Sequence, residues 1–224
     1  MSAEENRWLS EEHARAWLEK QPDRADAGRP EQFELLARLL PFDESSELAF
    51  ADLGAGHGTL AEVVLERFAD ARALCLDVNP AMIAAGEERL TRFGARVRYA
   101  RMDLGGAWPP DATGPFDAVV SSRAIHHLGD GAKTALFAAI LERLRPGGWF
   151  LNFDYIRAPS DTLSELYVRA LGDAHGPPSD HHQGHHSHTR PLDGQLRLLA
   201  AVGFIDVDCF WKHLATALYG GRKP

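Results

Sequence analysis

Residues 48–58 read LAFADLGAGHG, a short apolar strand that runs directly into a glycine-rich loop. Glycine lets the backbone turn tightly and lets a ligand approach it closely. The dinucleotide pattern G-x-G-x-x-G needs a third glycine at position 59, which is Thr59, and no G-x-x-x-x-G-K-[ST] phosphate loop is present. The loop alone is therefore compatible with a ligand-binding turn and with a plain tight turn.

Strand and helix signals alternate on the carboxyl side of this loop. We expect strands at 48–53, 73–76, 97–100, 116–121, 149–153, 205–211 and 215–219, and helices at 59–68, 80–93, 132–144, 163–171 and 191–202. Such alternation is typical of an α/β fold with a doubly wound, mostly parallel sheet. The last two strands are joined too tightly to hold a helix between them, so they should pair antiparallel.

The chain before the first strand has a different pattern. Residues 5–40 carry apolar and aromatic side chains at helical spacing, interrupted at Pro22, Gly28 and Pro30. We predict an N-terminal helical cover over residues 1–41 and a catalytic domain over residues 42–224. A lid insert is expected within that domain at about 155–190, where it would cover a substrate.

Composition excludes several classes of protein. The 224 residues include 24 basic and 32 acidic side chains, a formal net charge of −8, which argues against a nucleic-acid partner. Cys75 and Cys209 lie far apart, so a disulfide framework is excluded. The acidic N-terminus does not resemble a signal peptide, and no window approaches the roughly 20 apolar residues of a membrane span. We expect a cytoplasmic monomer or homodimer.

Acidic residues stand where successive strands are expected to end. Asp77 follows the second strand, 23 residues after Gly54, and Asp103 follows the third, with Met102 beside it. Ligands of doubly wound sheets bind beyond these carboxyl ends, where an ionised carboxylate accepts hydrogen bonds from ribose hydroxyls. The alternative is that each aspartate only caps the helix that follows it.

These motifs together resemble the class I S-adenosylmethionine-dependent methyltransferases, from about Ala49 to Gly221. The resemblance implies a seven-stranded Rossmann-like sheet whose last, antiparallel strand lies between the fifth and sixth. It also implies S-adenosyl-L-methionine as the cofactor, with the methionine part in the glycine loop. The cofactor-binding residues assigned in this way are Asp52, Gly54, Gly56, Gly58, Asp77, Val78, Met82, Met102, Asp103 and Ser121.

The segment after the fourth strand supplies candidates for the chemistry. In the resembled family it borders the methyl acceptor, and imidazole titrates near pH 6.5, so His126 is the predicted general base. Arg123, His127 and Asp154 are predicted to contact the substrate. The alternative for each of these residues is a structural role in packing or in bracing a loop.

A histidine-rich stretch follows the predicted lid helix. His181, His182, His185 and His186 lie within six positions, and imidazole is the commonest metal ligand. The neighbouring glycines and prolines do not give the rigid helix of a zinc enzyme. We therefore predict no native metal, and either a substrate-contacting lid or a neutral loop.

The predicted function is methyl transfer to oxygen or nitrogen of a small molecule. Ser121-Ser122-Arg123-Ala124 stands where methyltransferases of nucleic-acid amines carry an asparagine-proline-proline-tyrosine type of motif. The alternatives are an RNA or protein methyltransferase of the same fold, and a cofactor-binding relative that does not methylate.

Overall fold

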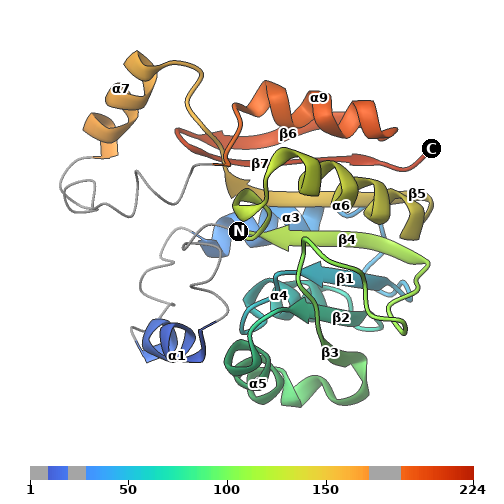
Figure 1. Ribbon diagram of the computed structural model, residues 1–224. Coiled ribbons are helices and arrows are strands. Elements are labelled where there is room, and N and C mark those ends of the chain that lie inside the picture. The colour runs from blue at the N-terminus through green and yellow to red at the C-terminus, as the bar shows by residue number, and fades with distance from the viewer. Residues whose placement is uncertain (1–9, 20–28, 172–187) are drawn as a thin grey trace.

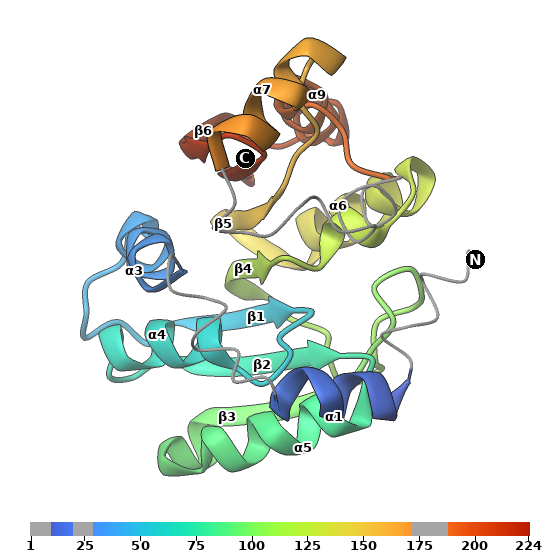
Figure 2. The ribbon, with the colours of Figure 1, turned by 90° about the vertical axis from the view of Figure 1, so that its left-hand side faces the viewer.

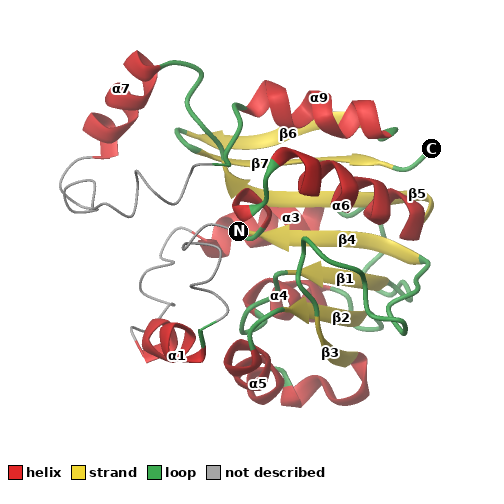
Figure 3. Ribbon diagram, in the orientation of Figure 1, coloured by secondary structure: helices red, strands yellow, loops and turns green. Residues whose placement is uncertain are grey.

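The computed structural model describes residues 10–19, 29–171 and 188–224, and its centre is one seven-stranded sheet covered by helices on both faces (Figure 3). The strands are β1 (Ala49–Leu53), β2 (Arg72–Asp77), β3 (Val97–Arg101), β4 (Phe116–Ser122), β5 (Leu144–Tyr155), β6 (Ile205–His213) and β7 (Thr216–Arg222). The helices are α1 (Glu11–Glu19), α3 (Arg29–Leu39), α4 (Thr59–Arg67), α5 (Pro80–Arg89), α6 (Asp130–Arg143), α7 (Asp161–Leu171) and α9 (Leu192–Val202).

The strand order is β3-β2-β1-β4-β5-β7-β6. The first five strands run parallel, while β7 pairs antiparallel with both β5 and β6. The predicted α/β class, the seven strands and the insertion of the antiparallel strand are all confirmed. The direction in which successive strands are added to the sheet reverses between β1 and β4. Ligands of such sheets bind at this switch point.

Two apolar layers hold the helices on the sheet. On one face α3 and α4 bury side chains such as Phe33, Leu36 and Val64 against the strands. On the other face α6 and α9 bury Phe137 and Leu199. Burial of this kind contributes about 25 cal/mol per Å² of apolar surface. The strand ends, and not the faces of the sheet, are therefore left for a ligand.

Two element boundaries differ most from those expected. The helix predicted over 80–93 ends at Arg89, and a 3₁₀ segment follows over Thr91–Arg96, in which Gly94 has a φ of 56°. Strand β5 begins at Leu144 rather than at Trp149, because Leu144 pairs with Phe116 and the register then shifts before Ala118. The connection expected between the helix at 132–144 and the strand at 149–153 thus lies inside β5.

The N-terminal segment is divided between two places. Helix α3 belongs to the sheet's own core, and the ring centroids of Phe33 and Phe153 are 6.0 Å apart. Helix α1 lies beside α5 instead (Figure 2), and Asn79 Nδ2 donates to the Ser10 carbonyl at 3.1 Å. Helix α7 stands apart from the sheet (Figure 1). None of the described helices is long and apolar enough to cross a membrane.

Candidate cofactor and acceptor site

The glycine loop turns the chain from β1 into α4. Gly54 and Gly56 have φ values of 66° and 54°, which other residues rarely adopt. A Cβ at Gly54 would lie 2.2 Å from the Cβ of Ala124, whereas a Cβ at Gly56 would meet nothing within 4 Å. Gly54 is therefore required by packing, and Gly56 leaves open space beside the backbone for a ligand.

Asp77 joins this loop to the end of β2. Its Oδ2 accepts from the Gly56 N–H at 2.8 Å and its Oδ1 accepts from the Asn79 N–H at 2.9 Å. Each carboxylate oxygen has a second lone pair, so the side chain keeps the capacity to accept two hydroxyl protons. Burial raises the pKa of Asp77, although these backbone hydrogen bonds oppose the shift. The geometry fits the predicted ribose acceptor.

Asp52 lies on β1 just before the loop, and only 1% of its surface is exposed. Its Oδ2 has no hydrogen-bond partner in the described part of the chain. Burial and the nearby charge of Asp77 raise the pKa of Asp52 to about 8. The Asp52 carboxyl is therefore mostly protonated at neutral pH, and it can donate as well as accept a hydrogen bond.

Three other predicted cofactor residues belong to the core. Met82, Met102 and Ser121 are at most 3% exposed, which leaves little of each side chain for contact with a ligand. The hydroxyl of Ser121 donates to the Leu53 carbonyl at 2.8 Å and thus links β4 to β1. The burial of these side chains favours a structural role over the predicted cofactor contact, because neighbouring elements already enclose them.

The remaining predicted residues do lie at the strand ends. Asp103 is exposed after β3, and its Oδ1 accepts from the Gly105 N–H at 2.9 Å. Val78 is half-buried next to Asp77, and Gly58 adopts a φ of 84° as α4 begins. Asp103 is thus available to accept a hydrogen bond from an exocyclic amine.

Helix α1 reaches over the glycine loop. The rings of Trp17 and His57 are 5.5 Å apart in an edge-to-face arrangement, and His57 Nε2 lies 3.0 Å from Thr59 Oγ1. His57 was not predicted as a site residue. Helix α1 thus contacts the loop, whereas α3 packs in the core, and the predicted N-terminal cover stays a prediction.

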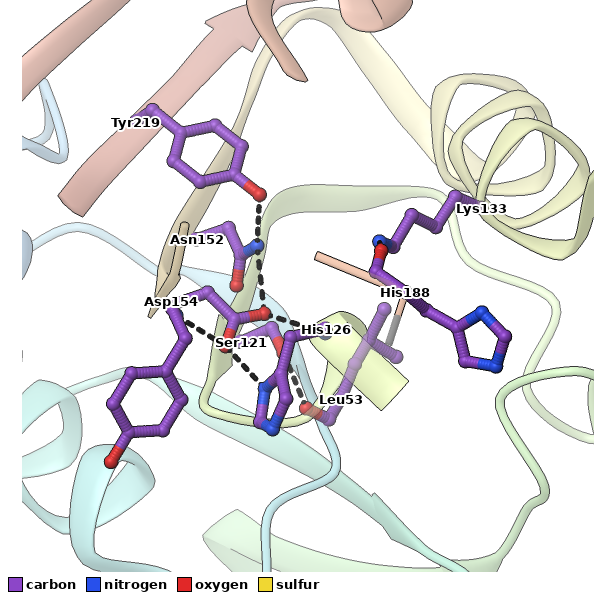
Figure 4. A network of polar contacts seen from close by, with 9 residues as sticks. Leu53, Ser121, His126, Lys133, Asn152, Asp154, His188 and Tyr219 are labelled. Carbon is purple, nitrogen blue, oxygen red and sulfur yellow. Dashed lines mark hydrogen bonds and ion pairs between the residues drawn. The ribbon is translucent and has the colours of Figure 1, made fainter. Parts of the chain in front are cut away.

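A buried histidine–aspartate pair lies at the ends of β4 and β5 (Figure 4). His126 Nδ1 is 2.6 Å from Asp154 Oδ1, and the backbone N–H of His126 donates to Asp154 Oδ2 at 2.9 Å. The side chains are 4% and 1% exposed, respectively. Asn152 Nδ2 donates both to Tyr219 Oη at 2.8 Å and to Asp154 Oδ2 at 3.4 Å.

The hydrogen bond between the two side chains has a defined direction. Burial alone would raise the pKa of Asp154, but the charge of His126 and its hydrogen bond hold that pKa below its ordinary value. An ionised Asp154 only accepts hydrogen bonds, so it fixes the His126 proton on Nδ1. Whenever the ring is neutral, its lone pair then resides on Nε2. Both oxygens of Asp154 accept hydrogen bonds from protein donors, and its predicted contact with the substrate stays a prediction.

The other two residues predicted to contact the substrate, His127 and Arg123, lie close to this pair. His127 lies 3.9 Å from His126 between ring centroids, and the Tyr155 ring meets His126 at 5.1 Å. The Arg123 guanidinium lies over the Phe153 and Tyr155 rings, 5.6 Å and 5.1 Å from their centroids. Arg123 is thus braced by aromatic rings close to the strand ends, beside the His126–Asp154 pair.

The candidate metal ligands His181, His182, His185 and His186 lie outside the described residues. Within residues 10–19, 29–171 and 188–224, no group of three or more histidine, cysteine, aspartate or glutamate side chains is arranged to hold a metal ion. The predicted absence of a native metal stays a prediction.

Comparison with known sequences gives a consistent result. A family model described as a methyltransferase domain matches residues 50–148. Trans-aconitate 2-methyltransferase of Azoarcus sp. (strain BH72) is 32% identical over 115 residues, 51% of this chain and 41% of that protein. Phosphoethanolamine N-methyltransferase 1 of Arabidopsis thaliana is 32% identical over 123 residues, 54% of this chain and 24% of that protein. The chain spans less than half of the length of these two relatives.

Solved structures share the fold. An O-methyltransferase family protein from Burkholderia thailandensis matches with a TM-score of 0.73 at 18% identity, over 98% of this chain and 62% of the other. Human N-acetylserotonin methyltransferase, in complex with SAM, matches with a TM-score of 0.66 at 19% identity, over 96% of this chain and 57% of the other. Residues 50–148 thus match a methyltransferase domain, and the solved structures show the same fold over nearly the whole chain.

Proposed function

We propose that this protein transfers the methyl group of S-adenosyl-L-methionine to an oxygen or nitrogen atom of a small-molecule acceptor. The observation that carries the proposal is the His126–Asp154 pair at the ends of β4 and β5, next to the glycine loop after β1. Both features lie at the same edge of the sheet, because parallel strands place their carboxyl ends together. A base and a methyl donor can therefore meet there.

The cofactor half of the site is supported by the loop geometry. The open side of Gly56 and the two-oxygen arrangement of Asp77 suit a nucleoside whose ribose hydroxyls donate to that carboxylate. When bound, the cofactor supplies a methyl group that its sulfonium already activates. The protein's part is to hold the acceptor atom in line with that methyl, about 3 Å away.

The acceptor half needs a base, because a hydroxyl or ammonium acceptor loses a proton around methyl transfer. His126 Nε2 takes that proton, and the ionised Asp154 stabilises the imidazolium that forms. A positioned base of this kind contributes about 10²–10⁴-fold to the rate. Asp154 acts through His126 and is therefore a positioning residue.

The relatives support a small acceptor. By their names, they methylate trans-aconitate and phosphoethanolamine, which offer a carboxylate oxygen and an amine nitrogen. Cys75 and Cys209 are both free thiols, which suits a reducing compartment, so we place the reaction in the cytoplasm. Helix α1, which contacts His57 through Trp17, would serve as the N-terminal cover of the cofactor.

The test is transfer of labelled methyl from the cofactor to a fractionated cell extract. We expect the label in the small-molecule fraction, and His126→Gln should reduce it at least about tenfold while cofactor affinity stays the same. Label in the RNA or protein fraction alone would show that the protein is instead an RNA or protein methyltransferase. Cofactor binding with no transfer to any fraction would favour a relative that does not methylate.

A further inference from the structure

A pocket of about 440 Å³ lies on the side of the sheet that α6 and α9 cover. This volume is within the range of roughly 300–1,000 Å³ that is usual for small-molecule sites. Three segments line the pocket: the start of α6, the chain just after β5, and the approach to α9. The charged side chains around it are Asp130, Arg157, His188, Arg190, Asp193 and Arg197.

Positive charge is in excess among these side chains, although the whole chain carries a formal net charge of −8. Asp130 pairs with Arg190, and Asp193 Oδ2 pairs with Arg197 Nη1 at 2.8 Å. Arg157 is the third arginine, and it forms no ion pair with a described residue. One guanidinium at the pocket is thus left without a counter-charge from the described part of the chain.

The backbone holds the arginines in place. The Arg157 N–H donates to the Arg190 carbonyl at 2.9 Å, and Arg157 pairs with Pro191 in a short parallel bridge. Asp130 engages Nε of Arg190 and leaves the outer nitrogens of its planar fork for another acceptor. Forked guanidinium groups match carboxylate and phosphate oxygens two at a time.

The start of α9 also lines the pocket. Pro191, Asp193 and Gly194 line the pocket as this helix of 11 residues begins. Pro191 has no N–H, and the Gly194 N–H donates to the Pro191 carbonyl at 3.0 Å, so the contribution of α9 is the helix dipole, which favours negative charge at this end. Together with the arginines, this end of the helix suits an anionic ligand.

The pocket is also adjacent to the proposed active site. His188 Nδ1 lies 3.9 Å from where a Cβ at Gly129 would stand, and Gly129 follows His127 by two residues. Lys133 Nζ donates to the His188 carbonyl, and its charge acts on Asp154 (Figure 4). The pocket therefore lies at the same edge of the sheet as His126, beyond the ends of β4 and β5.

We propose that this pocket binds a carboxylate or phosphate group of the methyl acceptor, so that the acceptor is an acidic small molecule. This inference rests on the proposed function for the part that concerns the acceptor. The binding of an anion by Arg157 and its neighbours does not depend on methyl transfer, and it can be measured separately.

The first experiment measures anion binding without turnover. Calorimetric titration with citrate and with inorganic phosphate should show binding to the wild-type protein, and Arg157→Gln should weaken it at least about tenfold, because a hydrogen-bonded charge is lost. Arg72→Gln is the matched control. Arg72 is an exposed arginine at the start of β2, whereas the pocket lies beyond the carboxyl ends of the parallel strands. Absence of binding to the wild-type protein, or equal binding by Arg157→Gln, would overturn the proposal that the pocket binds an anion.

The second experiment measures labelled methyl transfer to a set of small carboxylic and phosphoric acids and to their uncharged amides and esters. We expect transfer to acids, with the KM of Arg157→Gln raised at least about tenfold at nearly unchanged kcat. Equal transfer to acids and uncharged analogues would overturn the pocket while the proposed function stands. Anion binding lost in Arg157→Gln, with no transfer to any acceptor, would leave the pocket in place and overturn the proposed function.

Discussion

Asp154→Asn is the substitution that tests the proposed base most directly. The asparagine has the same shape, but its amide has one oxygen and one NH₂ group in place of two accepting oxygens. Asp154 now accepts from both the ring Nδ1 and the backbone N–H of His126. If the new NH₂ group faces the ring, Nδ1 must accept, the ring proton moves to Nε2, and that atom can no longer take a proton from the acceptor.

The size of the effect follows from the contact. The His126–Asp154 hydrogen bond is 2.6 Å long, and both side chains are at most 4% exposed, so solvent does little to screen it. A hydrogen bond to a charged group contributes about 1.5–3 kcal/mol. Since about 1.4 kcal/mol corresponds to a tenfold change in rate, kcat should fall by roughly ten- to a hundredfold.

The assay is the pH dependence of kcat, with cofactor affinity measured in parallel. Asp117→Asn is the matched control, because Asp117 also binds a backbone N–H and an arginine but lies near the start of β4. We expect Asp154→Asn to lose the limb of the pH profile that reports His126, and Asp117→Asn to retain it. If both variants lose the same activity, the effect is one of stability and His126 is not the base.

Three further predictions concern the cofactor half of the site. Asp77→Ala should weaken cofactor binding about tenfold or more in calorimetry, because the ribose hydroxyls lose a charged acceptor, whereas the exposed Asp70→Ala should not. Trp17→Ala should raise the dissociation rate of the cofactor in stopped-flow fluorescence, and an unchanged rate would argue against a cover. The pKa of Asp52 is raised to about 8, so the folded protein keeps a proton that the unfolded chain releases near pH 4. This contribution to the free energy of unfolding should therefore decline by up to about 1.4 kcal/mol per pH unit between those values, and Asp52→Asn should flatten the slope in urea titrations.

Much of the fold follows from local patterns in the sequence. The apolar run before Gly54, the acids after later strands and the tight link between the last two strands predict the sheet and its antiparallel member. The start of β5 could not be predicted in this way, because residues 145–148 have the composition of a turn. Only the pairing of Leu144 with Phe116, 28 positions earlier, shows that the strand begins there.

The sequence predicts where the site residues lie along the strands, but not how far their side chains are buried. Asp77 and His126 lie where the strand ends place them, yet Met102 and Ser121 are enclosed by neighbours that no single motif reveals. Tyr219 was missed because its link to Asn152 depends on the pairing of β5 with β7. Alternation along β5 already puts residues 152 and 154 on one side of the strand, which was an available signal for Asn152.

The three acids at the strand ends show why one sheet edge can serve both halves of the reaction. Asp77, Asp103 and Asp154 each accept a hydrogen bond from a backbone N–H one or two residues further on. That local bond orients each carboxylate where the chain leaves the sheet, so the strand order decides what each can reach. Asp77 and Asp103 follow β2 and β3 on one side of the switch point, whereas Asp154 follows β5 on the other. Under the proposed function, a ligand between β1 and β4 would therefore meet acceptors for a nucleoside on one side and an oriented base on the other.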